Sequence, residues 1–227
     1  MEPTLHYSIA ITEPHSHFMH VSMTIPTGGA SEVCVGMPVW TPGSYMVREY
    51  SQFLQDLSAT TSSGSPVGLE QLDKRRWKIS TEGQDVVQFH YTLYANQLTV
   101  RTNHVDDTHG FICGAATFMM VDGMKDEPST VSLSIPDDWQ AVTPLIQDEN
   151  GLYHADDFDM LVDCPIETGY LHRVDFEAGG KPHAYIFWGE GNYDIDAIVK
   201  DTIDVIEETA KHYGGELPYE EYLFIVH

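Results

Sequence analysis

The chain has 227 residues, with 35 Asp and Glu against 11 Lys and Arg, so its formal net charge is −24. Such a charge opposes binding to phosphate backbones and to anionic lipid surfaces, and we therefore expect neither nucleic acid nor membrane as a partner. Hydrophobic residues make up 42% of the chain, which is too many for a disordered acidic tail. A chain of this length can bury a core without disulfide bonds.

The three cysteines, Cys34, Cys113 and Cys164, form no C-x-x-C pair. An odd number without paired spacing predicts reduced thiols and a cytoplasmic location. The start of the chain, Met1-Glu2-Pro3-Thr4, lacks the basic and apolar segments of a signal peptide.

The first 185 residues show the two-residue periodicity of strands. Leu5, Tyr7, Ile9 and Ile11 alternate with polar residues, which is typical of a half-buried strand. Pro42-Gly43 fits the central positions of a turn, and we expect Trp40 beside it to pack in the core. Further strands are predicted over 18–25, 33–39, 77–79, 86–94, 98–102, 131–135, 166–176 and 184–188, and near Val142.

The pattern changes to helical spacing after Asn192. Ile195, Ile198 and Ile203 fall on one face of a predicted helix, which Asn192 or Asp194 can cap and Gly214-Gly215 ends. Residues 222–227 then read as an apolar strand. The change of period predicts a β domain over residues 1–185 and, over 186–227, the start of a second domain, and we expect the polypeptide to be truncated inside that domain.

Few residues suggest chemistry by their spacing alone. His15-Ser16-His17, on an expected strand, could offer two metal ligands, but no third ligand follows at a definite spacing and we expect no metal site. The zinc-protease signature His-Glu-x-x-His is absent, and Ser44 lacks the setting of a nucleophile elbow. Cys113 has no neighbouring basic residue, so a small core residue is expected there. The paired carboxylates, such as Asp106-Asp107, are expected to face water.

Three segments together resemble the N-terminal part of the glycyl aminopeptidases, zinc metallopeptidases of the thermolysin-like superfamily that often carry a PDZ domain. The segments are Pro38 to Tyr50 with its Pro-x-Trp-x-Pro-Gly-Ser-Tyr stretch, Leu98 to Gly114, and Phe158 to Gly169. Residues 214–222 resemble the beginning of the peptidase domain. Family members usually carry Asn where this chain has Cys113.

The resemblance implies a mainly β fold: a two-sheet β-sandwich or saddle, followed by the first helix and strand of a truncated α/β, thermolysin-like catalytic domain. It also implies that the catalytic zinc of the full-length protein is bound beyond His227, so this fragment holds no cofactor and is expected to be inactive. The full-length protein would remove N-terminal residues such as glycine from peptide substrates. The expected cleft-facing residues are Arg101, Thr102, Asp106, His109 and Thr117.

Two alternatives remain open. One is a stand-alone β-sandwich module that binds peptide or carbohydrate, which a row of exposed aromatic residues on one sheet would favour. The other is a self-contained hydrolase, which would need two buried carboxylates with different pKa values in one pocket. The apolar strand at 222–227 also predicts that the chain could dimerise by strand addition.

Overall fold

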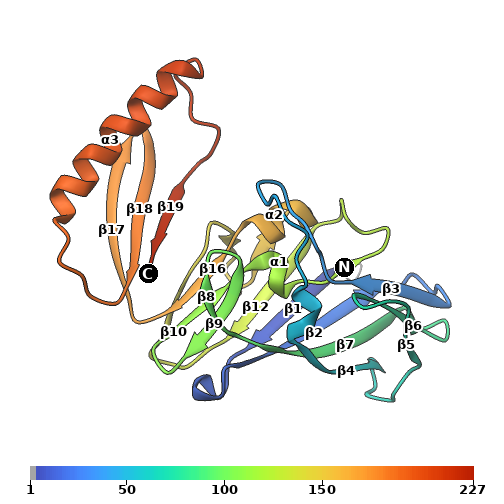
Figure 1. The fold of residues 1–227 in the computed structure, drawn as a ribbon. Coiled ribbons are helices and arrows are strands. Elements are labelled where there is room, and N and C mark those ends of the chain that lie inside the picture. The colour runs from blue at the N-terminus through green and yellow to red at the C-terminus, as the bar shows by residue number, and fades with distance from the viewer. Residues whose placement is uncertain (1–3) are drawn as a thin grey trace.

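The computed structural model describes residues 4–227 and is mainly β, which confirms the predicted fold class (Figure 1). Residues 4–169 form three hydrogen-bonded sheets, and residues 171–226 form a fourth, three-stranded sheet with one long helix. We call these the N-terminal and the C-terminal region. No helix in the described part of the chain is both long and apolar enough to cross a lipid bilayer.

A seven-stranded sheet is the centre of the N-terminal region. Its strand order is β14-β15-β12-β1-β2-β7-β4, and β1 pairs in parallel with β12 while the other neighbours are antiparallel. The strands are β1 (Leu5–Ala10), β2 (Phe18–Pro26), β4 (Leu54–Thr61), β7 (Val86–Tyr94), β12 (Ser129–Ser134), β14 (Ile146–Gln147) and β15 (Tyr153–Ala155).

Two smaller sheets complete this region. One has the order β11-β3-β6-β5 and comprises β3 (Glu32–Gly36), β5 (Leu69–Gln71), β6 (Arg76–Ser80) and β11 (Met120–Val121). The other has the order β13-β16-β10-β9-β8 and comprises β8 (Asn96–Thr99), β9 (Thr102–Asp106), β10 (His109–Ile112), β13 (Gln140–Val142) and β16 (Ile166–Gly169). The short helices are η1 (Pro14–Ser16), η2 (Tyr50–Phe53), α1 (Gly114–Thr117) and α2 (Phe158–Asp163).

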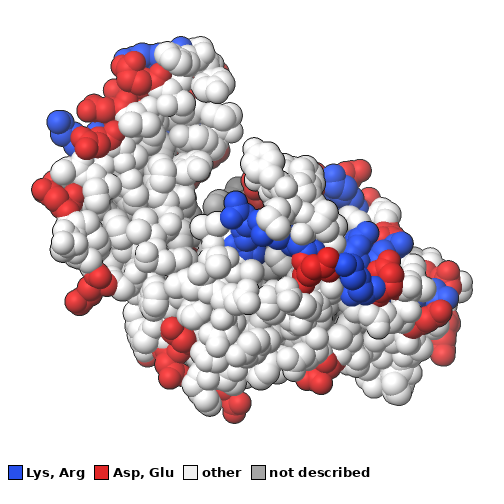
Figure 2. Space-filling model, viewed as in Figure 1, with Lys and Arg blue, Asp and Glu red and all other residues white. Residues whose placement is uncertain are grey.

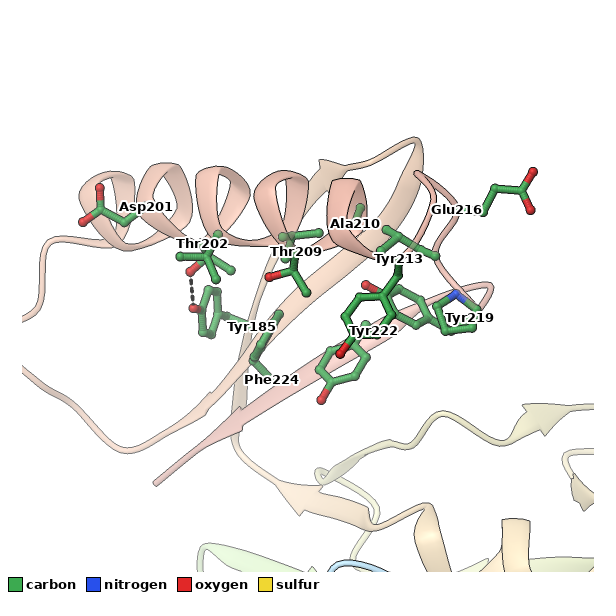
Figure 3. A pocket seen from close by; sticks show the side chains of 14 residues that line it. Tyr185, Asp201, Thr202, Thr209, Ala210, Tyr213, Glu216, Tyr219, Tyr222 and Phe224 are labelled. Carbon is green, nitrogen blue, oxygen red and sulfur yellow. Dashed lines mark hydrogen bonds between the residues drawn. The ribbon is translucent and has the colours of Figure 1, made fainter.

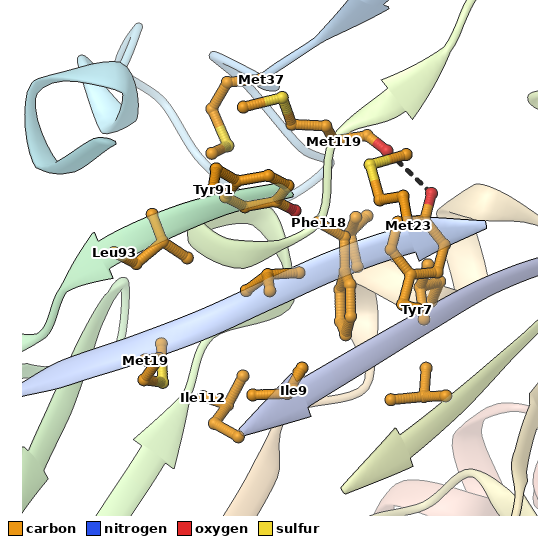
Figure 4. Close-up of a cluster of buried hydrophobic side chains, with 14 of the residues drawn as sticks. Tyr7, Ile9, Met19, Met23, Met37, Tyr91, Leu93, Ile112, Phe118 and Met119 are labelled. Carbon is orange, nitrogen blue, oxygen red and sulfur yellow. Dashed lines mark hydrogen bonds between the residues drawn. The ribbon is translucent and has the colours of Figure 1, made fainter. Parts of the chain in front are cut away.

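The core of the N-terminal region fills the space between the large sheet and the segment around α1 (Figure 4). Tyr7 and Phe118 meet edge to face, with ring centroids 5.1 Å apart. The Tyr7 hydroxyl donates a hydrogen bond to the carbonyl of Met119 at 2.7 Å, and the Tyr91 hydroxyl donates to that of Thr117 at 2.8 Å. Burial raises the pKa of both phenols well above the usual value, so both stay neutral and donate.

The C-terminal region consists of β17 (Leu171–Ala178), β18 (Lys181–Trp188), α3 (Ile195–His212) and β19 (Tyr222–Val226). β17 and β18 form an antiparallel hairpin, and β19 adds to β18 in parallel. The predicted helix is confirmed, and the Asp194 carboxylate caps it by accepting from the Ala197 N–H at 3.1 Å. A domain boundary after residue 185 would divide β18. The last strand of the N-terminal sheets ends at Gly169, and the first strand of the C-terminal sheet begins at Leu171.

Some local predictions from the sequence are wrong. The predicted strand 98–102 is interrupted by a turn at Val100 and Arg101, which separates β8 from β9. His15 and His17 lie on a 3-10 turn rather than a strand, and His17 takes the left-handed conformation with φ 60°. Trp40 is 54% exposed instead of packing in the core. Figure 2 shows the acidic side chains spread over both regions, with several along α3.

Candidate functional site

A pocket of about 310 Å³ opens where four segments distant in the sequence meet. Its walls come from the loop at 41–44, the turn at 100–101, the segment from β10 to α1, and the end of α2 with the residues after it. We call it the Arg101 pocket, and its polar lining includes Ser44, Tyr50, Arg101, Cys113 and Asp163. The three segments that resemble the peptidase family therefore converge on one pocket.

A tight turn shapes the loop on one side of the Arg101 pocket. The Ser44 N–H donates to the Thr41 carbonyl at 3.0 Å, and Gly43 between them takes a φ of 84°. A φ in this range favours glycine, so the Pro42-Gly43 turn predicted from the sequence is confirmed. The Ser44 hydroxyl is mostly buried and donates to the Met46 carbonyl at 3.3 Å, which is a turn-stabilising role rather than that of a nucleophile.

Apolar side chains stand exposed at or beside the pocket. Tyr45 is 95% exposed, and Met46, Val47 and Val100 are also largely open to solvent. Of these four, Val100 lines the pocket, and the other three directly follow its lining residue Ser44 in the sequence. The pocket lining therefore combines apolar side chains with a few polar groups.

The titratable groups of the pocket lack an activated nucleophile. Burial raises the pKa of the Cys113 thiol, although the N–H groups of Ala116 and Ala115 oppose this, so the thiol stays protonated at neutral pH. Burial, followed by the nearby Cys113, raises the pKa of Tyr50, against the smaller opposite effects of Arg48 and Arg101. Arg101 is exposed and forms no ion pair within the described part of the chain. The pocket is suited to binding, and its own residues supply no nucleophile.

The other predicted cleft residues occupy different positions. The Thr102 hydroxyl donates to the Gln97 carbonyl at 2.7 Å and closes the turn that presents Arg101. Asp106 accepts from the N–H and hydroxyl of Thr108; its partial burial acts to raise its pKa, but these bonds and His104 outweigh it and lower the pKa. Of the five predicted residues, only Arg101 lines the Arg101 pocket.

Thr117 is completely buried. Its hydroxyl donates to the Asn103 Oδ1 at 3.0 Å, and the same oxygen accepts from the Cys113 N–H at 2.8 Å. Asn103 thus ties α1 to β9 and fixes the floor beneath the pocket. A role for Thr117 in the cleft stays a prediction.

His109 belongs to a buried cluster that the sequence analysis did not predict. Its Nε2 contacts Oε1 of Glu167, and Nε2 of His227 lies 3.1 Å from Oε2 of the same carboxylate. Both His109 and Glu167 are fully buried, and Phe111, which lines the Arg101 pocket, packs against the His227 ring at 5.2 Å. We call His109, Glu167 and His227 the His–Glu–His cluster; it connects the two regions of the molecule.

A second concave surface lies in the C-terminal region. A groove of about 830 Å³ runs between α3 and the strands β18 and β19 (Figure 3). Aromatic rings dominate its wall, including Tyr185, Tyr213, Tyr222 and Phe224, and the Tyr185 and Thr202 hydroxyls are hydrogen-bonded at 2.6 Å. We call it the α3 groove. Its charged lining residues are Asp201 and Glu216, and the rest of the lining is mainly apolar or aromatic, which suits packing against polypeptide.

Comparison with known proteins gives a consistent result. Residues 6–170 match the family described as the Peptidase M61 N-terminal domain. The curated proteins contain no match to the sequence. The fold is similar to the crystal structure of an aminopeptidase N family protein from Idiomarina loihiensis, with 28% sequence identity and a TM-score of 0.91. That similarity covers 99% of this chain and 39% of that chain.

A second solved structure, native leukotriene A4 hydrolase from Saccharomyces cerevisiae, is similar with a TM-score of 0.54 and 12% identity. The similarity covers 99% of this chain and 37% of that one, and at this identity it shows the fold alone. The chain thus spans less than half the length of either protein.

Proposed function

Because the chain belongs to the peptidase M61 N-terminal domain family, we propose that it is the non-catalytic N-terminal part of a zinc-dependent aminopeptidase. The observation that carries the proposal is the Arg101 pocket, which three family-like segments build together and which has the exposed Val100 in its lining. In the longer protein this surface forms one wall of the peptide-binding cleft. Enclosure of a cleft limits access to chain ends, which favours exopeptidase activity.

The Arg101 pocket offers binding groups that suit a peptide. The free guanidinium of Arg101 can donate to a peptide carbonyl or carboxylate, and Asp163 in the same pocket offers an acceptor. The resemblance to the glycyl aminopeptidases supports N-terminal glycine as the residue removed. A peptide is therefore the substrate class that we propose for the longer protein.

The zinc that this activity needs would be held by residues outside this sequence, which contains no His-Glu-x-x-His. When bound, zinc polarises the scissile carbonyl and activates a water molecule. The part of the present residues is to bind and orient the peptide. The unpaired thiols support a reducing, cytoplasmic location for the whole protein.

The α3 groove supports the proposal that more polypeptide follows in the functional protein. Its aromatic wall is open, and the solved relative from Idiomarina loihiensis is more than twice as long as the matched part. We assign the groove to the remaining peptidase polypeptide. The alternative is that a second copy of the chain packs here by dimerisation through the β19 edge. The mass of the 227-residue chain in solution distinguishes these two possibilities, because a monomer excludes dimerisation.

Aminopeptidase assays with a glycyl substrate and added zinc test the proposed function. We expect no turnover from the 227-residue chain and activity from the longest natural polypeptide that contains it. In the active protein Arg101→Ala should raise KM about tenfold or more, as expected for loss of a charged hydrogen bond, and should change kcat little. The control Lys200→Ala removes an exposed charge on α3. Turnover by the 227-residue chain, or equal effects of the two variants, would contradict the proposal.

The binding-module alternative finds no support in the N-terminal region, where the exposed Trp40 and Tyr94 lie on separate elements. Aromatic rings that share one sheet, those of Tyr185, Tyr222 and Phe224, occur in the C-terminal region and line the α3 groove.

A further inference from the structure

We propose that the His–Glu–His cluster binds one divalent cation of the zinc type, at the junction of the N-terminal and C-terminal regions. This site is formed entirely by residues of the present chain and does not depend on the proposed peptidase function.

The donor atoms converge on one point in space. One ligand atom from each of His109, Glu167 and His227 lies within 4.8 Å of the others. They come from β10, from β16 and from the residue after β19, so strands of two different sheets bring them together. Two imidazoles and one carboxylate are a common protein ligand set for zinc, with a fourth position left to water or another ligand.

The charge of Glu167 needs compensation. Its carboxylate is fully buried, and its ionic partners among residues 4–227 are the two imidazoles alone, with no Lys or Arg in contact. A buried carboxylate is costly unless a cation accompanies it. Neutral imidazoles supply no charge, so a metal ion bound between the three donors would balance the carboxylate. The convergence of three donors on one point favours the metal ion.

The surroundings fix the donors before a cation binds. Trp188 stacks on the His109 ring with centroids 4.3 Å apart and planes at 16°, and its indole N–H donates to the Thr108 hydroxyl at 3.2 Å. Nε2 of His109 is the ring nitrogen that faces the Glu167 carboxylate and is therefore the ligating atom. Such preorganisation lowers the cost of binding.

Close backbone packing holds Glu167 in register. A Cβ atom on Gly169 would lie 2.4 Å from the Thr108 carbonyl oxygen, and one on Gly110 would lie 2.5 Å from Oγ1 of Thr168. β10 and β16 can therefore approach closely enough to place His109 and Glu167 side by side. The His227 side chain is 17% exposed, so a cation can enter from its side of the cluster.

Calorimetric titration of the 227-residue chain with ZnCl₂, after treatment with a chelator, tests the proposal. We expect one tight site per chain, and Co²⁺ in place of Zn²⁺ should give the visible absorption of a four-coordinate cobalt ion and quench the fluorescence of Trp188. His227→Ala and Glu167→Gln should each lower zinc affinity by at least about 100-fold, because loss of outer-shell partners alone costs about 10- to 100-fold. The readout is metal affinity, so its failure leaves the peptidase proposal untouched.

His15→Ala is the matched control, because it removes an exposed histidine near His17 and His20 and should leave the tight site unchanged. Trp188→Phe should abolish the fluorescence change but not the binding. If Glu167→Gln fails to fold, His227→Ala, at the open side of the cluster, still provides the test. The proposal is overturned if zinc binds no more tightly to the unaltered chain than to His227→Ala.

Discussion

The N-terminal region encloses Tyr7, Met23 and Phe118 completely, whereas the C-terminal region leaves Tyr213 and Tyr222 exposed beside the α3 groove. The first region has large sheets whose inner faces meet one continuous core. The second has one three-stranded sheet and one helix, and within α3 only Ala210 is buried. A single sheet with one helix cannot cover both of its faces, so its stability depends on what packs against it.

The contact between the regions is unlike the interior of either one. It includes the His–Glu–His cluster, the Trp188 stack and Phe111, so aromatic rings and a buried carboxylate take part in it.

The largest expected effect is the difference in stability loss when one phenylalanine in each region is replaced by alanine. Phe118→Ala should lower the free energy of unfolding by about 3–5 kcal/mol, because it leaves a cavity in a closed core. Phe224→Ala, at a partly exposed position on β19, should cost only about 1 kcal/mol, since less apolar surface leaves water on folding. Urea unfolding followed by circular dichroism measures both. Similar losses for the two variants would contradict the inference that the N-terminal core is closed while the C-terminal sheet is partly open to solvent.

An intermediate effect is expected at the junction. Gly169→Ala places a Cβ against the Thr108 carbonyl at a residue with φ 130°, and we expect a loss of about 1–3 kcal/mol. Gly180→Ala in the β17–β18 hairpin is the matched control, because it shares a positive φ of 73° but meets no atom within 4 Å. Denaturation midpoints compare the two, and a larger effect at Gly180 would mean that close packing at the junction is unimportant.

The smallest expected effect is pH-dependent and lies on the surface of the N-terminal region. Three hydrogen bonds lower the pKa of Asp148 to about 2. The side chain of His154 has the largest effect, followed by the backbone N–H groups of Leu152 and Asn150. A carboxyl whose pKa is lowered on folding stabilises the protein above its unfolded pKa, and this contribution is lost as the pH falls through the folded value. The contribution of Asp148 should therefore be complete above about pH 4 and disappear toward pH 2.

Urea midpoints of Asp148→Asn and of the unaltered chain should differ slightly at pH 7 and converge as the pH falls below 4. Glu149→Gln, at the neighbouring exposed position, is the control and should show no such convergence. A difference that stays constant down to low pH would show that the effect of Asp148 does not depend on its charge.

The parts of the fold that the sequence predicts are those with a clear period. The alternation in β1 and β2 and the helical spacing of α3 follow directly from one buried and one exposed face. β10 was missed because all four of its residues are buried, so no alternation exists. β4 was missed because a register shift between Gln55 and Ser58, with Asp56 at φ 53°, breaks its pattern.

The candidate site was predictable only where neighbours in sequence are neighbours in space. The Pro42-Gly43 turn beside the pocket is local and was predicted, whereas the turn that presents Arg101 was not, because residues 98–102 were expected to form one strand. The partners of His109 are 58 and 118 positions further along the chain, and no local pattern connects them. A signal did exist, because Glu167 is a lone carboxylate within the apolar stretch Cys164 to Gly169, where a buried charge needs a partner.

The parallel pairing of β1 with β12 has a consequence for biosynthesis. β1 lies in the middle of the large sheet, yet its partner from Ser129 to Ser134 leaves the ribosome more than a hundred residues later. Until then one edge of the β1–β2 hairpin stays open, and exposed strand edges are prone to aggregate. We therefore expect this protein to fold slowly and only after translation has passed residue 134, as is usual for topologies dominated by contacts between distant residues.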